Sequence, residues 1–237
     1  MKRWMIGCSL ALAVSLSACT DGEKMTAVTT IDSDFESGTD GWSADFSDYS
    51  TATDTATLAL RSRRALLPSP LDNTRYGILM QGSNRSDDLF MFVKKKIKGF
   101  RPGGTYNVAF DIDFATNESN DSFGAGGAPG TSVYLKAGAS PNEPAKKLVG
   151  DYYNFTLDKG QQSQGGKEMA VIGNASNDSD ETVYKIVKRS SADNSVTVNA
   201  NASGEIWLCV GTDSGYEGIS VFYYDRIKAT ISEKISN

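Results

Sequence analysis

The chain has no histidine among its 237 residues, and this absence restricts the chemistry that its side chains can do. A Ser-His-Asp triad or a Cys-His pair is excluded, as are histidine sites for zinc, haem or non-haem iron. Acid–base chemistry would depend on carboxylates, lysines or tyrosines. A bound metal would take oxygen ligands, which favours calcium or magnesium.

Asp225 is the acid whose position most requires a partner. It lies in Ile219–Ile231, an apolar segment that alternates with period two and predicts a half-buried strand. The residues that share its parity are Ile219, Val221, Tyr223, Ile227, Ala229 and Ile231. A carboxylate on that face needs a cation or several hydrogen bonds. A structural Ca²⁺ with Asp34 or Glu36 as co-ligand would satisfy it, and so would a β-bulge that turns Asp225 outward, a capping role or an arginine.

Two further groups could bind or transform a ligand. Asp111 and Asp113 lie two residues apart, on one face of an expected strand, and paired carboxylates can catalyse glycoside hydrolysis. Nothing beyond their presence supports catalysis, and adjacent acids on a solvated face explain them well. Tyr152 and Tyr153 follow Gly150-Asp151 and would point to opposite faces of a strand, so one ring could pack in the core while the other contacts a sugar.

The N-terminus has the layout of an export signal. Lys2 and Arg3 precede a mostly apolar run that ends at Leu16, and this run is too short to span a bilayer. The segment Leu16-Ser17-Ala18-Cys19 resembles the lipobox of bacterial lipoproteins. That resemblance implies cleavage after residue 18, lipidation of Cys19, and a membrane anchor of two or more acyl chains. Thr20 at the next position favours the outer membrane, if the cell has one.

Composition is typical of a folded, acidic domain. Hydrophobic residues make up 39% of the chain and its formal net charge is −5, which disfavours nucleic acid as a partner. The three cysteines are Cys8 and Cys19, near the signal, and Cys209 in an apolar run. A disulfide framework is therefore not expected, and Cys209 is predicted to be a buried, inert thiol.

Short alternating segments separated by turn residues predict an all-β, antiparallel β-sandwich, of jelly-roll (galactose-binding-like) type. The expected strands are Thr55–Leu60, Tyr76–Gln81, Leu89–Ile97, Thr105–Ala115, Thr131–Ala137, Thr182–Lys188, Ser195–Asn199, Glu205–Gly211 and Ile219–Ile231. Short helical turns are expected at Arg61–Leu67 and around Lys159–Ala170. The predicted organisation is a signal peptide at 1–18, a lipidated tether at 19–30 and one sandwich domain at 31–237.

The two ends of the domain resemble carbohydrate-binding-module jelly rolls. Asp34-Phe35-Glu36-Ser37-Gly38 with Gly41-Trp42 is similar to the opening of those modules, and Tyr223-Tyr224-Asp225-Arg226-Ile227 to their closing strand. The resemblance implies paired first and last strands, a structural calcium near them, and sugar binding. The chain also resembles uncharacterised bacterial lipoproteins.

The leading hypothesis is a lipid-anchored envelope protein that binds a carbohydrate or glycan and is not an enzyme. An envelope interaction or assembly protein without a small ligand is the first alternative. A carboxylate-based glycosidase or lyase is the second.

Overall fold

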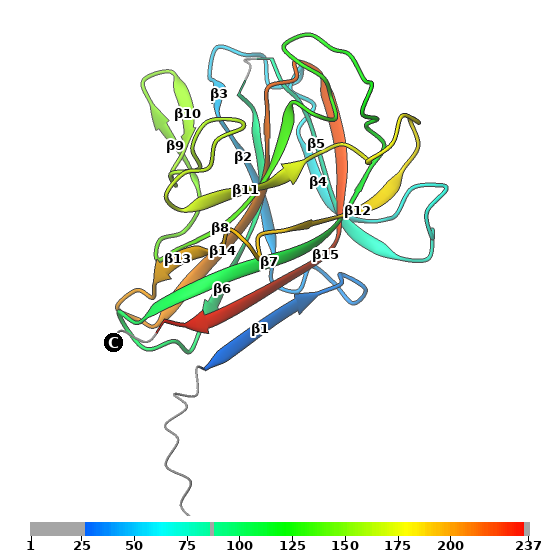
Figure 1. Ribbon diagram of the computed structural model, residues 1–237. Helices are drawn as coiled ribbons and strands as arrows, with labels where there is room; N and C mark the ends of the chain where they lie inside the picture. Colours follow the sequence, from blue (N-terminus) through cyan, green and yellow to red (C-terminus); the bar gives the residue numbers. More distant parts are fainter. Residues whose placement is uncertain (1–26, 86–87, 235–237) are drawn as a thin grey trace, which may run out of the picture.

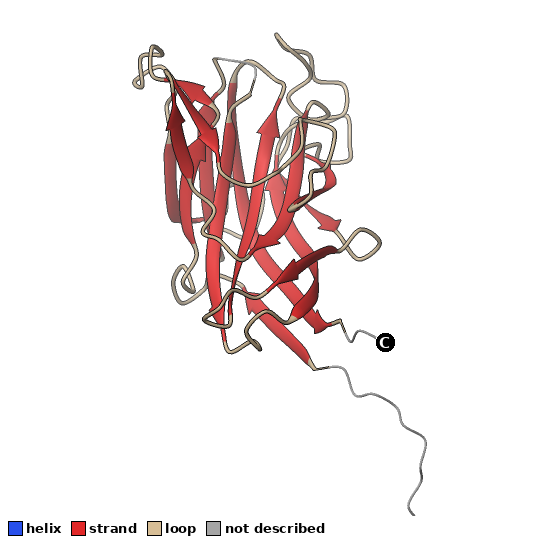
Figure 2. Ribbon diagram, turned by 90° about the vertical axis from the view of Figure 1, so that its left-hand side faces the viewer, coloured by secondary structure: helices blue, strands red, loops and turns tan. Residues whose placement is uncertain are grey.

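The computed structural model describes residues 27–85 and 88–234, and all regular structure in these ranges is β (Figures 1 and 2). Two antiparallel sheets pack face to face, which confirms the predicted all-β, antiparallel β-sandwich class. The expected helical turns at Arg61–Leu67 and Lys159–Ala170 are wrong: the first segment is a strand, and the second is a loop that leads into another strand.

The larger sheet has seven strands. Its order is β12 (Lys185–Ser190), β7 (Thr105–Thr116), β15 (Ile219–Glu233), β5 (Tyr76–Ser83) and β4 (Arg61–Leu66), with β1 (Val28–Ser33) paired to β15 and β13 (Val196–Asn199) paired to β7. We call it sheet A. The first and last strands, β1 and β15, are therefore neighbours, and the chain enters and leaves at one end of the sandwich (Figure 1).

The second sheet, sheet B, has five strands, and a small third sheet flanks it. Sheet B has the order β11 (Met169–Asn174), β8 (Val133–Ser140), β14 (Glu205–Ser214), β6 (Phe90–Lys98) and β2 (Ser43–Ser47). The third sheet has the order β3 (Tyr49–Ser50), β10 (Tyr152–Phe155) and β9 (Lys146–Val149). In the described ranges no helix is long and apolar enough to cross a bilayer.

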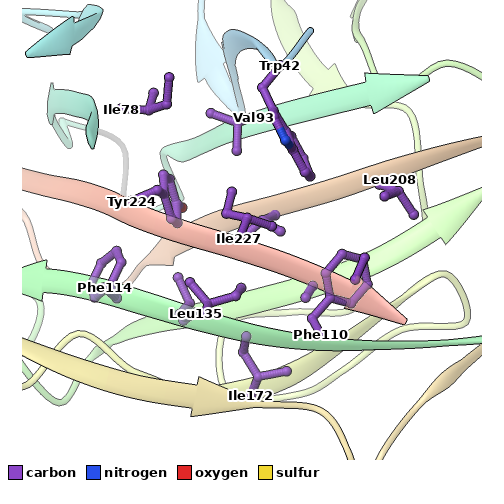
Figure 3. Packing of buried hydrophobic residues seen from close by; sticks show 14 of the residues in the cluster. Trp42, Ile78, Val93, Phe110, Phe114, Leu135, Ile172, Leu208, Tyr224 and Ile227 are labelled. Atoms are coloured by element: carbon purple, nitrogen blue, oxygen red, sulfur yellow. The ribbon is translucent and has the colours of Figure 1, made fainter. Parts of the chain in front are cut away.

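The core lies between sheets A and B and follows from alternation along their strands. Phe110 and Phe114 of β7 face Leu135 of β8 and Leu208 of β14 across this layer (Figure 3), and Ile112 of β7 belongs to the same core cluster. Each of these side chains is at most 1% exposed. Burial of such a side chain contributes roughly 1.5–3 kcal/mol, so this layer is the main source of stability.

A β-bulge in β15 reverses its alternation at Asp225. The register with β7 shifts between Tyr224 and Arg226, so one residue is inserted. Before the bulge Phe222 and Tyr224 face the core, and after it Ile227 and Ala229 do. The prediction that Tyr223, Val221 and Ile219 share the core face with Ile227 is therefore wrong. A one-residue slip moves every earlier side chain to the other face.

Two other segments differ from the sequence prediction because local pattern did not reveal their partners. Thr55–Leu60 forms turns, in which Asp54 accepts hydrogen bonds from Ala56 N and Thr57 N, while Leu58 packs into the core. Arg61–Leu66 is rich in helix formers, yet it pairs along its whole length with β5. Tertiary pairing overrides helix propensity there.

A buried ionic cluster lies on the outer side of sheet B. The fully buried Lys136 and Asp213 pair at 2.8 Å between Nζ and Oδ2. Lys136 Nζ also donates to the carbonyls of Lys159 and Gln164, at 2.8 and 3.0 Å. Lys159 Nζ lies 2.8 Å from Asp213 Oδ2 and 3.3 Å from Asp48 Oδ2. The cluster therefore fixes the loop between β10 and β11 to the sheet.

The pKa values of the two lysines shift in opposite directions because the lysines have different numbers of acidic neighbours. Burial lowers the pKa of Lys136, against the attraction of Asp213. Burial also acts to lower the pKa of Lys159, but Asp213, Asp48 and Asp88 outweigh it and raise that pKa to about 12. Cys209 is a free, buried thiol, as predicted, and burial raises its pKa.

Replacing the shared acid tests how much the cluster stabilises the fold. Asp213→Ala removes a carboxylate that two buried ammonium groups share, so we expect a loss of about 3–5 kcal/mol in the free energy of unfolding. Asp180→Ala removes an exposed acid and should change it by less than about 0.5 kcal/mol. Urea unfolding followed by tryptophan fluorescence measures both, and equal effects of the two substitutions would refute the structural role.

Candidate functional site

A pocket of about 200 Å³ opens where the edge strands β2 and β4 of the two sheets face each other. We call it the edge pocket. Its floor is apolar and its rim carries hydroxyl and guanidinium groups. The lining residues are Thr39, Trp42, Ser43, Ala44, Ser62, Arg63, Arg64, Ile78 and Val93. A volume below the roughly 300–1,000 Å³ of drug-sized sites suits a ligand of about one ring.

The floor is part of the main core and is rigid for that reason. Trp42, Ile78 and Val93 come from the loop after β1, from β5 and from β6, and their side chains lie near one another at one side of the core (Figure 3). All three are at most 4% exposed. Trp42 is therefore a core residue, and the face that it leaves toward the pocket is small.

Arg64 is held at the rim by two hydrogen bonds and a ring contact. Its Nε donates to the carbonyl of Phe35 at 2.6 Å, and its Nη2 donates to the carbonyl of Glu36 at 2.6 Å. The guanidinium carbon lies 3.4 Å from the centre of the Tyr76 ring. Stacking and two hydrogen bonds fix the guanidinium before any ligand arrives, which lowers the entropy cost of binding.

The backbone at Phe35 adopts an unusual conformation that serves this arrangement. Phe35 has φ of +64°, a left-handed value that is an outlier for a bulky residue. In an extended chain the carbonyls of Phe35 and Glu36 would point in opposite directions. The left-handed residue brings both carbonyls to one guanidinium, and burial of the Phe35 ring, 1% exposed, holds the strained backbone in place.

A hydrogen-bonded chain anchors the other side of the pocket. Trp42 Nε1 donates to Ser33 Oγ at 3.1 Å, and Ser33 Oγ in turn donates to the carboxylate of Asp40. Lys95 Nζ lies 2.7 Å from Asp40 Oδ2. Burial acts to raise the pKa of Asp40, but the hydrogen bonds from Lys95 and Ser33 outweigh it and lower that pKa. The indole is therefore held at both its ring and its N–H.

The three acids predicted as calcium ligands have separate partners. Asp34 Oδ1 accepts from the backbone N–H of Glu36 at 3.1 Å, and Glu36 Oε1 accepts from that of Tyr76 at 3.1 Å. Asp225 Oδ2 accepts from Arg75 Nη2 at 2.5 Å. The arginine partner and the bulge, both alternatives to calcium, are thus present together. Asp225 nevertheless stays buried, at 1% exposure.

These residues do not fit a calcium ion in this arrangement. The Arg75 guanidinium already supplies positive charge at the Asp225 carboxylate. Within residues 27–85 and 88–234, no three His, Cys, Asp or Glu side chains are grouped so that they could hold a metal. Burial raises the pKa of Asp225, Arg75 opposes that rise, and Asp113 and Glu36 add to it. The calcium site stays a prediction without support from the geometry.

Tyr152 and Tyr153 lie on β10 and do not line the edge pocket. Their opposite orientation follows from their adjacent positions in a strand. The Tyr153 ring packs against Tyr49, with centroids 5.1 Å apart, and Lys146 Nζ lies 5.5 Å from its centre. Both tyrosines are half-buried, and a sugar-binding role for them stays a prediction.

Asp111 and Asp113 lie on the outer face of sheet A, in a separate hollow of about 240 Å³. Asp111 accepts from Ser190 Oγ at 2.8 Å and lies 3.8 Å from Lys228 Nζ. In the register of the sheet, Asp113 lies between Lys188 of β12 and Arg226 of β15. Cross-strand charge pairing accounts for both acids.

The edge pocket was not predicted from the sequence, because its lining comes from four separate segments. One signal was available. Arg61-Ser62-Arg63-Arg64 is a basic cluster in an acidic chain, and in a strand Ser62 and Arg64 share one face. Reading this segment as a strand instead of a helical turn is not enough to find the pocket. The pairing of the strand with β5 must also be known before Arg64 can be placed opposite the Gly41-Trp42 turn.

No protein-family model matches this chain, and no curated protein matches it. Solved structures similar to it include the mannan-recognising carbohydrate-binding module TmCBM27, at 7% identity, TM-score 0.35, and coverage of 88% of this chain and 99% of that one. The K3 adhesin domain of Lys-gingipain from Porphyromonas gingivalis has 11% identity, TM-score 0.36, and coverage of 86% and 99%. TmCBM61, solved with β-1,4-galactotriose, has 13% identity, TM-score 0.33, and coverage of 79% and 86%. Similarities of this size are not evidence of a shared function.

The Arg75–Asp225 pair predicts a pH-dependent stability defect. Arg75→Gln removes the charge that opposes the raised pKa of Asp225, so that pKa should rise further. A folded-state pKa above the unfolded value means that the ionised form destabilises the fold. We therefore expect Arg75→Gln to lower the free energy of unfolding by about 1–3 kcal/mol at pH 8, and by less as the pH falls toward 4. Thermal melts across this pH range measure it, and a defect that grows on acidification would contradict the assignment.

Proposed function

We propose that this protein is a non-enzymatic glycan-binding domain and that the edge pocket holds one sugar residue of its ligand. The observation that carries the proposal is the combination of an apolar floor with a fixed polar rim in one ring-sized pocket. Sugars present the same combination, because a pyranose has an apolar C–H face and a rim of hydroxyl groups.

The rim groups match the hydrogen-bonding needs of a sugar. Ser62 and Thr39 provide hydroxyls that both donate and accept. Arg64 provides N–H donors in a fixed plane. Ala44 and Val93 leave the centre of the pocket apolar. A ligand that lacked hydroxyls would leave the polar groups unpaired on binding, which costs free energy and gives specificity.

We further propose that the domain is displayed from a membrane through a lipid on Cys19, with the outer membrane favoured if the cell has one. Residues 1–26 lie outside the described part of the structure, so this part of the proposal is supported by the sequence of the export signal. The structure adds that the described chain begins beside β15, at the end of the sandwich where the last strand finishes (Figure 1).

Filling the pocket should abolish glycan binding. Ser62→Trp places an indole at the mouth between β2 and β4, so we expect at least a tenfold loss of affinity for whichever glycan the full chain binds. The measurement is a glycan microarray that spans plant, host and bacterial polysaccharides, followed by calorimetry on the best binder.

The matched control is Thr30→Trp, which adds the same side chain at an exposed position of β1 outside the pocket. It should bind as the unaltered chain does. Silence of the unaltered chain across all glycans would refute the function. Binding that survives Ser62→Trp would move the site away from the edge pocket and toward Tyr152 and Tyr153.

The lipid anchor has its own test. Cys19→Ser removes the thiol that would be lipidated, so the protein should move from the membrane fraction to the soluble fraction of the expressing bacterium and lose incorporation of radiolabelled palmitate. Cys8→Ser, which alters a cysteine inside the expected signal, should leave both unchanged. Palmitate incorporation that persists in Cys19→Ser would exclude this residue as the attachment point.

A further inference from the structure

The edge pocket carries positive charge without a compensating acid. Its lining includes Arg64, whose side chain shares a face of β4 with Ser62, and no acidic residue. Arg63 also lines the pocket, but its side chain points to the other face of β4. The chain as a whole is acidic, with 29 acidic and 24 basic residues. A cavity with an arginine and no acidic residue is therefore contrary to the acidic character of the chain as a whole.

Arg64 is held by neutral acceptors, so its charge is not neutralised. Four other arginines, Arg75, Arg101, Arg189 and Arg226, each pair with a carboxylate. Arg64 instead bonds two backbone carbonyls, and among the described residues no acid lies within ion-pair distance of it or of Arg63. A guanidinium has five N–H donors. Two are used by the carbonyls, which leaves donors for an anionic ligand.

The nearest acids are already engaged elsewhere. Asp40 pairs with Lys95 and accepts from Ser33, and the Glu36 carboxylate accepts from the Tyr76 backbone. The net negative charge of the protein acts only weakly at the pocket, because salt screens exposed charges beyond about 8 Å at physiological ionic strength. The Arg64 guanidinium therefore decides which ligand charge is favoured.

We propose that the edge pocket selects a sugar residue that carries a carboxylate, a uronic acid. This inference rests on the proposed function and names its ligand class. The sugar ring would lie on the apolar floor of Trp42, Ala44 and Val93, and its carboxylate would accept charge-assisted hydrogen bonds from Arg64. Neutral sugars would leave the Arg64 charge uncompensated in the filled pocket.

The experiment compares matched ligand pairs on the full chain. Oligomers of galacturonic, glucuronic and mannuronic acid are titrated by calorimetry beside the corresponding neutral galactose, glucose and mannose oligomers, which differ only at C6. At least one uronate should bind ten times or more tightly than its neutral counterpart. That advantage should shrink as salt rises, because an ion pair is screened.

Three substitutions separate the charge from the fold. Arg64→Lys keeps the charge but loses the two-carbonyl fork, and Arg64→Gln removes the charge; each should reduce the uronate advantage at least threefold. Arg61→Gln removes the same charge from the same strand outside the pocket lining and should leave it unchanged. Circular dichroism and melting temperature check that all three variants are folded.

The outcomes distinguish this inference from the function on which it rests. If neutral oligomers bind as well as every uronate, and Ser62→Trp abolishes that binding, the carboxylate selection is overturned while sugar binding at the pocket stands. A sulfated sugar that binds while no uronate does would also overturn it. If neither uronates nor neutral glycans bind, the proposed function fails as well.

Discussion

The bulge at Asp225 and its ion pair with Arg75 set the side-chain pattern of the strand on which the sandwich is built. β15 pairs with β5, β7 and β1, so an error in its register would propagate through most of sheet A. Because of the inserted residue, Phe222 and Tyr224 before the bulge and Ile227 and Ala229 after it all face the same core. The inserted residue is an acid at 1% exposure, so the Arg75 guanidinium that pairs with it must also be held in position.

Lysine and arginine side chains supply the internal cations of this fold. Asp213 is held by Lys136 and Lys159, and Asp225 by Arg75. The Lys136 ammonium is surrounded by a carboxylate and two carbonyls, a set of oxygen ligands of the kind that a calcium ion would also accept. A side-chain cation is covalently part of the chain, so the loops that it fixes do not depend on the supply of a free ion.

The strands that could be predicted from sequence are those whose side chains alternate without interruption. Thr105–Ala115 is the clearest, and it agrees with β7 to within a residue. Asp225 was recognised as anomalous, but sequence alone could not choose among calcium, bulge and arginine, because Arg75 is 150 residues away. Arg61–Leu67 was misread because its composition favours a helix while its partner strand decides the outcome. The edge pocket required both sheets to be placed before its lining could be seen.

The position of the pocket in the chain has a mechanical consequence. Thr39, Trp42 and Ser43 follow directly after β1, and β1 is the strand next to the expected tether. Tension between a captured polymer and the anchoring end would run along β1, which is paired over six residues with β15 in antiparallel register. The load would act in shear on all of those hydrogen bonds together instead of opening them one by one. A captured polymer would thus load the hydrogen bonds between β1 and β15 as one set.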